Sequence, residues 1–255
     1  MTTAGLLGRQ VRFTNLAFWR NPASAFFTFA FPLMFLVIFT SLLGSGRLEV
    51  APGIFIEQDR YYVAAMASFS VITATYTNLA ISVSFQRDAG ILKRTRGTPV
   101  PAAVYLSARV IHAILVSLLL VVITATFGIL VYGAGIPTGT ALLEFIVTVI
   151  VGAMAFSALG LLVVSRAKTV EAVSGLMNVV MLPMWLLSGS FFAADRFPHF
   201  MQPVVQALPL TIVNNALRAI QNEGAGLAAV VVPVAILAAW VVVGFALALW
   251  LFRWE

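Results

Sequence analysis

The residues of this chain that could do chemistry are mostly basic, and they gather in one segment. Residues 86–109, QRDAGILKRTRGTPVPAAVYLSAR, are the most basic stretch of the sequence. It contains one acidic residue, Asp88, and five basic residues, which are Arg87, Lys93, Arg94, Arg96 and Arg109. Such a segment cannot lie in hydrocarbon between two apolar runs, and its excess of Lys and Arg places it on the cytoplasmic side. We expect it to contact a cytoplasmic partner.

The basic segment also carries helix signals. Asp88 stands near the start of a short piece and Lys93 and Arg94 near its end, which is the order that a helix dipole favours. Gly97 can end that piece, and Thr98-Pro99 can begin another helix. The sequence therefore predicts a short helix over residues 87–94, lying across the inner membrane face, and then a turn back into the bilayer.

Catalytic and metal-binding signals are missing from the rest of the chain. There is no cysteine and there are two histidines, which excludes thiolate chemistry and a histidine-based metal centre. No GxxxxGK[ST], HExxH, GxSxG or GxGxxG pattern occurs. Glu144, near an interface, is expected to reach water, and His112 is expected to be an interfacial or packing residue; a functional role for either stays open. The chain therefore has no visible energy source of its own.

Composition identifies a polytopic membrane protein. Of 255 residues, 61% are hydrophobic and 9% are charged, whereas soluble domains have about 25% charged residues. The net charge of +6 does not indicate nucleic acid, because the basic residues stand at the ends of apolar runs. Six spans place both termini on one side. The positive-inside rule makes that side cytoplasmic, because the predicted inner segments hold eleven Lys and Arg and the outer ones four, at positions 47, 60, 196 and 218.

The apolar runs predict an all-α protein with six transmembrane helices. Residues 4–20 predict a basic helix lying in the inner interface, with an unstructured basic leader as the alternative. A polar outer loop is expected over residues 44–60. Three prolines break residues 193–223, which predicts short helices dipping into the outer leaflet as a re-entrant segment. The predicted spans are about 24–43, 61–85, 107–132, 142–165, 172–192 and 226–252.

Two spans carry features beyond a plain apolar helix. The second span is rich in hydroxyl and amide side chains, either for packing between helices or as the wall of a polar cavity; its central ones are Thr73, Thr75, Thr77 and Asn78. The fifth span is rich in methionine, which suits a surface for varied apolar ligands but also fills ordinary cores. Its candidate residues are Asn178, Met181, Met184 and Trp185.

Three motifs, in order, resemble the transmembrane subunit of type-2 ATP-binding-cassette (ABC) exporters, the group that includes daunorubicin-resistance permeases. The first is RDAGILKR at 87–94 followed by Thr98-Pro99, which is similar to the family's loop after span 2. The second is LSGSFF at 187–192 followed by Phe197-Pro198. The third is LPLT at 208–211 followed by ALRA at 216–219. Ile91 stands where Thr is common, and Gln86-Arg87 where acids are frequent.

The resemblance implies a dimer of six-span subunits, identical or homologous, with two copies of a separate cytoplasmic ABC ATPase subunit. It implies that the ATPase contacts Arg12 and the loop residues Arg87, Asp88, Gly90, Lys93 and Arg94. It also implies that spans 2 and 5 line the path, and that the re-entrant segment caps it. The chain itself is expected to hold no cofactor, ATP and Mg being bound by the ATPase.

We therefore expect a non-enzymatic permease of a bacterial inner membrane, in contact with lipid and not with nucleic acid. It would export an amphipathic or apolar, drug-like substrate, as in multidrug efflux and antibiotic resistance, along a wall without charge. A lipid or glycan as cargo is the alternative within the same mechanism. A passive channel or secondary carrier, and a scaffold without transport, remain as further alternatives.

Overall fold

A computed structural model describes residues 2–43, 46–51, 54–98, 100–135, 137–167, 169–191, 197–222 and 227–251. Within these residues, six helical stretches are long and apolar enough to cross a membrane, so the all-helical, multi-pass prediction is confirmed. They lie within α2 (Pro22–Leu43), α3–η1–α4 (Gln58–Asp88), α6 (Ala102–Tyr132), α7 (Thr140–Arg166), α8 (Val170–Leu187) and α11 (Leu227–Leu251).

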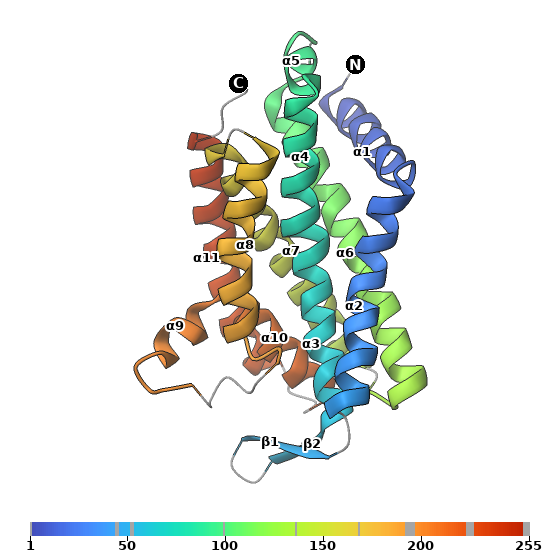
Figure 1. Ribbon diagram of the computed structural model, residues 1–255, viewed down its shortest axis with the longest axis vertical. Coiled ribbons are helices and arrows are strands. Elements are labelled where there is room, and N and C mark those ends of the chain that lie inside the picture. Colours follow the sequence, from blue (N-terminus) through green and yellow to red (C-terminus); the bar gives the residue numbers. More distant parts are fainter. Residues whose placement is uncertain are drawn as a thin grey trace.

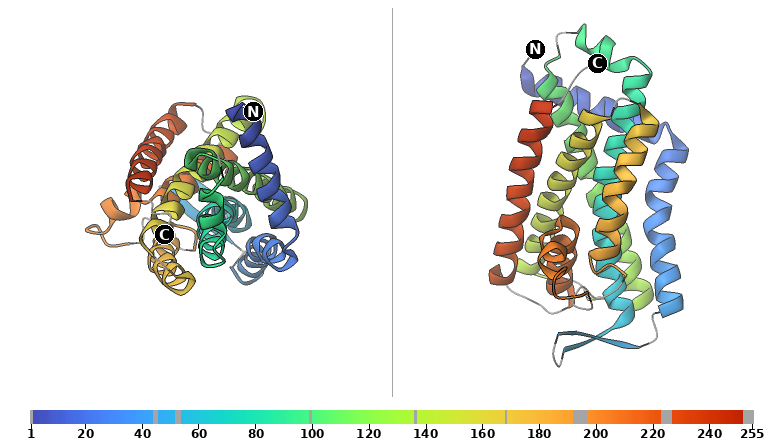
Figure 2. Two further views of the ribbon diagram at one scale, coloured as in Figure 1. Left: turned by 90° about the horizontal axis from the view of Figure 1, so that it is seen from above. Right: turned by 60° about the vertical axis from the view of Figure 1, so that its left-hand side comes forward.

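The six long helices form one upright bundle (Figure 1). Helix α1 (Thr3–Trp19) runs obliquely over one end of it, and α5 (Ile91–Arg96) projects beyond the same end (Figures 1 and 2). The start of α1 and the finish of α11 also lie there, so the prediction that both termini share a side is confirmed for the described residues. We call this the α5 end, and the opposite end, with β1 and β2, the hairpin end.

The second span is the centre of the bundle. It is one continuous helix in three parts, α3 (Gln58–Ile72), η1 (Thr73–Thr77) and α4 (Asn78–Asp88), and it packs against α2, α6, α7, α8 and α10. Residues 61–72 are all buried. The middle part, η1, is a π-helical turn in which Asn78 N donates to Thr73 O, five residues back. Such turns are rare and often stand at functional sites, and the sequence pattern did not indicate this one.

The boundary after the second span differs from the prediction. Asp88 is the last residue of α4, not the start of the short helix, because Gly90 adopts φ +71° and breaks the chain direction there. Helix α5 follows and ends at Arg96, with Gly97 as its C-cap, as expected. Pro99, which was predicted to begin the next helix, lies outside the described residues. That helix, α6, starts at Ala102 with Pro101 as its N-cap, five residues earlier than the predicted span.

The hairpin end carries three smaller features. Strands β1 (Arg47–Ala51) and β2 (Ile54–Glu57) pair antiparallel, with Arg47 opposite Glu57, where a plain loop was expected. Alternating apolar residues flank Pro52-Gly53 and were the available signal. Helices α9 (Gln202–Ala207) and α10 (Pro209–Asn222) lie within the segment predicted as 193–223, and α10 packs on α3 and α7. Residues 193–196 and 223, like 226 and 252 of the predicted sixth span, lie outside the described residues.

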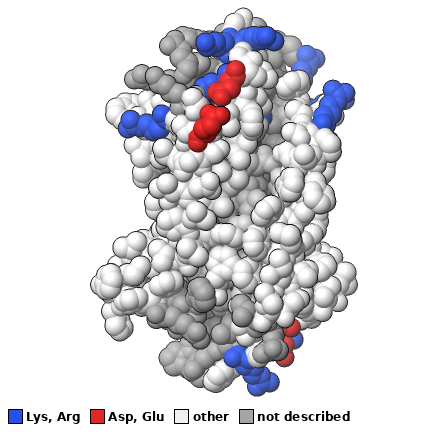
Figure 3. All heavy atoms as spheres, in the orientation of Figure 1, with Lys and Arg blue, Asp and Glu red and all other residues white. Residues whose placement is uncertain are grey.

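Charge is distributed to match a membrane-spanning body. In the space-filling view, Lys, Arg, Asp and Glu gather at the two ends, and the band between them shows none on this face (Figure 3). Large apolar side chains are exposed on the long helices, among them Val122, Leu130, Val179 and Val242. Such an apolar surface can face lipid hydrocarbon. The backbone N–H and C=O groups need no partner there, because they are hydrogen-bonded within each helix.

Candidate functional site

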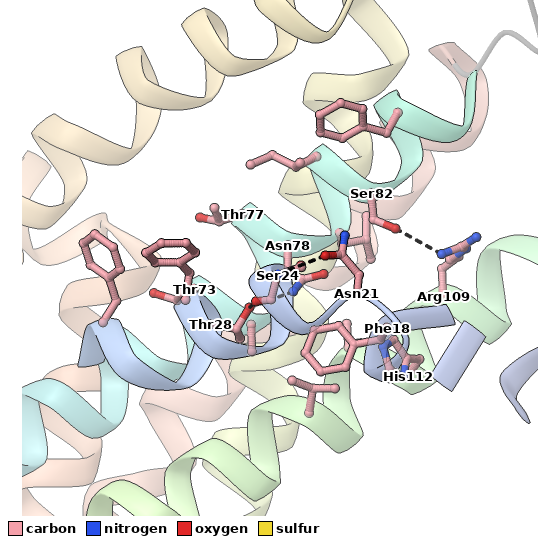
Figure 4. Close-up of a pocket in the computed structure, with 18 of the residues that line it drawn as sticks. Phe18, Asn21, Ser24, Thr28, Thr73, Thr77, Asn78, Ser82, Arg109 and His112 are labelled. Carbon is pink, nitrogen blue, oxygen red and sulfur yellow. Dashed lines mark hydrogen bonds between the residues drawn. The ribbon is translucent and has the colours of Figure 1, made fainter. Parts of the chain in front are cut away.

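A cavity of about 610 Å³ opens among α1, α2, η1, α4 and α6, with α8 closing part of one wall. This volume lies within the range of sites for small molecules, about 300–1,000 Å³. The lining is mainly aromatic and aliphatic, with polar groups at intervals. Figure 4 shows ten of the lining residues by label: Phe18, Asn21, Ser24, Thr28, Thr73, Thr77, Asn78, Ser82, Arg109 and His112.

The second span supplies one polar wall. Thr73, Thr77, Asn78 and Ser82 face the cavity (Figure 4). Thr75 does not, because it lies fully buried on another face of the helix, where its hydroxyl donates 2.6 Å to Val71 O. The polar residues of this span therefore divide into a set that lines the cavity and a set that packs between helices. Other hydroxyls of the same span serve packing, as Ser70 does with Thr124 at 3.1 Å.

Helix α2 supplies the facing wall, which sequence reasoning missed. Asn21, which directly precedes α2, lines the cavity together with Ser24 and Thr28 of α2, and Asn78 Nδ2 of α4 donates a 3.0 Å hydrogen bond to Thr28 Oγ1. Further along the same helix an aromatic stripe follows, made of Phe27, Phe31 and Phe35. The signal was present, because both sets recur at three- and four-residue spacing and so share a helix face.

The fifth span contributes only part of its predicted set. Met181 and Trp185 line the cavity; Thr77 Oγ1 donates 3.3 Å to Met181 Sδ, and Trp185 stacks on Phe69 with ring centroids 4.6 Å apart. Met184 is 4% exposed and packs in the core. Asn178 is exposed on α8 and does not line the cavity. The structure thus brings together Thr73, Thr77, Asn78, Met181 and Trp185, and leaves out three others.

A charged residue stands at the α5 end of the cavity, which corrects the expected wall without charge. Arg109 lies two turns inside α6 and is 5% exposed. Its guanidinium donates to Ser82 Oγ at 3.1 Å and to Gln86 Oε1, which also accepts from Tyr105 OH at 2.9 Å. His112, one turn further along, contacts the Phe18 ring edge to face at 5.4 Å and lines the same cavity.

Glu144 departs from its prediction. It was expected to reach water near an interface, but the side chain is 6% exposed on α7, and its Oε2 has no hydrogen-bond partner within the described part of the chain. The sequence pattern did not indicate that Glu144 faces the interior of the bundle, where α7 buries it. Glu144 does not line the cavity.

The predicted coupling residues Arg87 and Asp88 make specific contacts with another loop. Arg87 Nη1 donates 2.8 Å to Val164 O and Nη2 donates 2.5 Å to Ala167 O, both at the C-terminus of α7. Asp88 Oδ2 accepts from Val170 N at 3.3 Å, at the N-terminus of α8. The Arg87 guanidinium therefore lies at the negative end of the α7 dipole, and the Asp88 carboxylate lies at the positive end of the α8 dipole.

The other predicted coupling residues lie at the same end of the bundle. Lys93 and Arg94 are exposed on α5, and Arg12 is exposed on α1. Gly90 forms the left-handed N-cap of α5. Leu92, on the opposite face of α5, is 1% exposed and attaches the short helix to the bundle. Helix α5 therefore has one face held against the bundle by Leu92 and another face with exposed basic side chains.

Comparison with known proteins decides the family. The sequence profile of the ABC-2 type transporters matches residues 7–222, which is most of the chain and includes the cavity and the α5 end. The chain belongs to the ABC-2 type transporter family. Membrane permease subunits of this family lack an ATPase domain, so this chain is not expected to hydrolyse ATP, and the family implies an ATPase as a partner.

Curated relatives of this ABC-2 permease are distant. "Putative transport permease YvfS" of Bacillus subtilis (strain 168) is 25% identical over 190 residues, covering 74% of this chain and 75% of the relative. "Daunorubicin resistance ABC transporter permease protein DrrB1" of Streptomyces coeruleorubidus is 25% identical over 216 residues, covering 83% and 73%. "Inner membrane transport permease YadH" of Escherichia coli (strain K12) is 28% identical over 193 residues, covering 72% and 70%.

Proposed function

We propose that this permease forms the membrane path of an ABC exporter in a bacterial inner membrane, with the α5 end in the cytoplasm, and that its cargo is an amphipathic or apolar small molecule. The observation that carries the proposal is the cavity: its aromatic stripe and its hydroxyl and amide groups suit a ligand that is partly apolar and partly polar. DrrB1, by its name a daunorubicin-resistance permease, supports a drug-like cargo. A lipid of similar amphipathic character fits the same wall.

The α5 end is the proposed contact for two ATPase subunits, one on each permease of a dimer. Lys93, Arg94 and Arg12 offer exposed positive charge there, and α5 is the coupling helix in this proposal. When ATP closes the ATPases, their movement displaces α5 and α1. Because Arg87 and Asp88 hold the α7–α8 connection, the displacement reaches α8 and with it Met181 and Trp185 in the cavity wall.

At the hairpin end, α9 and α10 are the proposed re-entrant cap. Helix α10 packs on α3, α7, α8 and α11 without crossing to the other end (Figure 1). Asn214 and Arg218 on α10 donate to the carbonyls of Ser188 and Gly189 just after α8, at 3.2 and 3.1 Å. In this proposal the cap opens when the α8 end moves away from it, a rigid-body change between two packed states.

Reconstitution tests the proposal directly. The permease is placed in liposomes with and without its ATPase partner, and uptake of a fluorescent amphiphile into inside-out vesicles is followed after ATP addition. Transport is expected only with both subunits and hydrolysable ATP, and an ATPase variant that binds but does not hydrolyse ATP serves as the control. Transport by the permease alone would show a passive path and overturn the proposal.

A further inference from the structure

The cavity is chemically different at its two ends. Toward the α5 end the lining includes the polar residues Asn21, Ser82, Gln86, Arg109 and His112 beside the rings of Phe18 and Phe85, and toward the hairpin end the rings of Phe31, Phe35, Phe69 and Trp185 beside the hydroxyls of Thr73 and Thr77. Figure 4 shows Ser82 and Arg109 at one side of the view and Thr73 and Thr77 at the other. From Ser24 to Phe35 the lined part of α2 rises about 17 Å, at 1.5 Å per residue. The cavity therefore suits a long ligand with a polar head and an apolar tail.

The polar end holds a buried positive charge without a counter-ion. Among the lining residues that the structure describes there is one Arg, Arg109, and no Lys, Asp or Glu. The hydrogen-bond partners of Arg109 are the neutral Ser82, Gln86 and Tyr105, and the Tyr105 ring lies 5.2 Å from its guanidinium carbon. A charge removed from water is costly unless an opposite charge compensates it. No such partner for Arg109 occurs in the described part of the chain.

Several polar atoms of the cavity wall also lack partners in the described structure. They are Arg109 Nε, His112 Nδ1, Thr73 Oγ1 and Trp185 Nε1. Arg109 and His112 are 5% and 7% exposed and stand three residues apart, on one face of α6. Buried polar groups are normally hydrogen-bonded, so orphaned ones that share a cavity indicate a ligand that supplies the missing acceptors.

We propose that the α5 end of this cavity binds the anionic head of an amphiphile, with Arg109 as the counter-ion and the aromatic stripe around the apolar tail. A carboxylate, sulfonate or phosphate would neutralise the charge of the Arg109 guanidinium and would accept hydrogen bonds from it and from His112. A cationic amphiphile of the same shape is disfavoured, because it would face Arg109 in a site of low dielectric constant. Naming this amphiphile as the cargo rests on the proposed export function; the binding site itself does not.

Binding to the purified permease tests this without ATP or an ATPase. The protein is held in phosphatidylcholine nanodiscs, and the probe is 11-(dansylamino)undecanoic acid, compared with its methyl ester and with a trimethylammonium analogue of equal chain length. Energy transfer from Trp185 to the dansyl group reports occupancy, with empty nanodiscs as the blank and Trp185→Phe to identify the cavity signal. The acid is expected to bind about tenfold more tightly than the ester, as one charge-assisted hydrogen bond provides, and the trimethylammonium analogue most weakly.

Variants separate the charge from the fold. Arg109→Gln is expected to remove the preference for the acid, and Arg109→Lys to keep part of it. Arg47→Gln loses the same charge from the exposed hairpin and should leave the preference intact. Because Arg109→Gln could fail to fold, Ser82→Asp gives a second test: it places a carboxylate beside Arg109 that neutralises its charge, so the preference for the acid should be lost.

Each result decides the matter. Equal binding of acid and ester by the wild type, or an unchanged preference in Arg109→Gln or Ser82→Asp, overturns the proposal. Replacing phosphatidylcholine by phosphatidylglycerol identifies the source of the head group: loss of probe binding supports a membrane lipid, and retained binding supports a free amphiphile. Failure of ATP-driven transport with the acid preference intact would reject export and leave this site standing, whereas the reverse would reject the site alone.

Discussion

The guanidinium of Arg87 donates a 2.5 Å hydrogen bond to the carbonyl of Ala167, so the α5 end of the second span is fastened to the connection between α7 and α8. The neighbouring Asp88 accepts from Val170 N on the other side of that connection. Two adjacent residues of opposite charge thereby bind the negative end of α7 and the positive end of α8. A movement imposed on α5 is passed through this contact to the helix that carries Met181 and Trp185.

The first prediction concerns that contact. Arg87→Gln should lower ATP-driven export about tenfold or more while the ATPase remains active, because two hydrogen bonds from a charged group, each contributing about 1.5–3 kcal/mol, are lost or weakened. Export and ATP hydrolysis are measured in the same proteoliposomes. Arg166→Gln is the matched control, since Arg166 is exposed at the end of α7 and its loss removes the same charge. Equal effects of the two substitutions would contradict a specific role for Arg87.

The second prediction concerns the exposed face of α5. The double substitution Lys93→Glu and Arg94→Glu should uncouple ATP hydrolysis from export without changing membrane insertion, because both side chains point away from the bundle that Leu92 contacts. The measurement is ATPase stimulation on mixing the two subunits, together with export. Lys93→Arg with Arg94→Lys preserves the charge and should retain coupling. Unchanged export in the Glu variant would rule out α5 as the coupling surface.

The sequence predicted which segments form spanning helices but not which side of each helix faces the cavity, and the reason is physical. Six apolar runs give six spans because hydrocarbon thickness sets their length. Which side of a span meets a cavity depends on packing: Thr73 and Thr75 are two residues apart and lie on different faces of the helix, so one lines the cavity and the other is buried. In the sequence, Arg109 is the last residue of the predicted basic segment. It lies inside the bundle because α6 already begins at Ala102.

The third prediction concerns the hairpin end. Arg218 lies over the Tyr61 ring with its guanidinium carbon 3.8 Å from the centroid, and both side chains donate to Gly189 O, at 3.1 and 2.5 Å. Tyr61→Phe keeps the ring and removes one hydrogen bond, so it should reduce the unfolding free energy by about 1 kcal/mol. Arg218→Ala also removes a buried charged group and its cation–π contact, about 2 kcal/mol or more. Thermal unfolding of the purified permease measures both.

A functional readout distinguishes this cluster from simple structural support. If the contacts at Gly189 keep the cap closed, Arg218→Ala should raise the passive leak of small solutes from proteoliposomes, whereas Tyr61→Phe should raise it less. Asn214→Ala gives an intermediate test, since Asn214 holds the neighbouring carbonyl of Ser188 at 3.2 Å. A loss of stability without any leak in Arg218→Ala would show that the cluster supports the fold and does not gate the path.

The fourth prediction concerns the close approach of α7 to the π-helical turn. A Cβ at Gly160 would lie 3.0 Å from Tyr76 O, a backbone atom that cannot rotate away, and 3.4 Å from Tyr76 Cα. Gly160→Val should therefore push α7 from η1 and lower the free energy of unfolding by about 1–3 kcal/mol. Gly175→Val is the matched control, because no atom lies within 4 Å of the added Cβ on α8. Similar unfolding temperatures for the two variants would mean that η1 yields to α7 and does not depend on its contact.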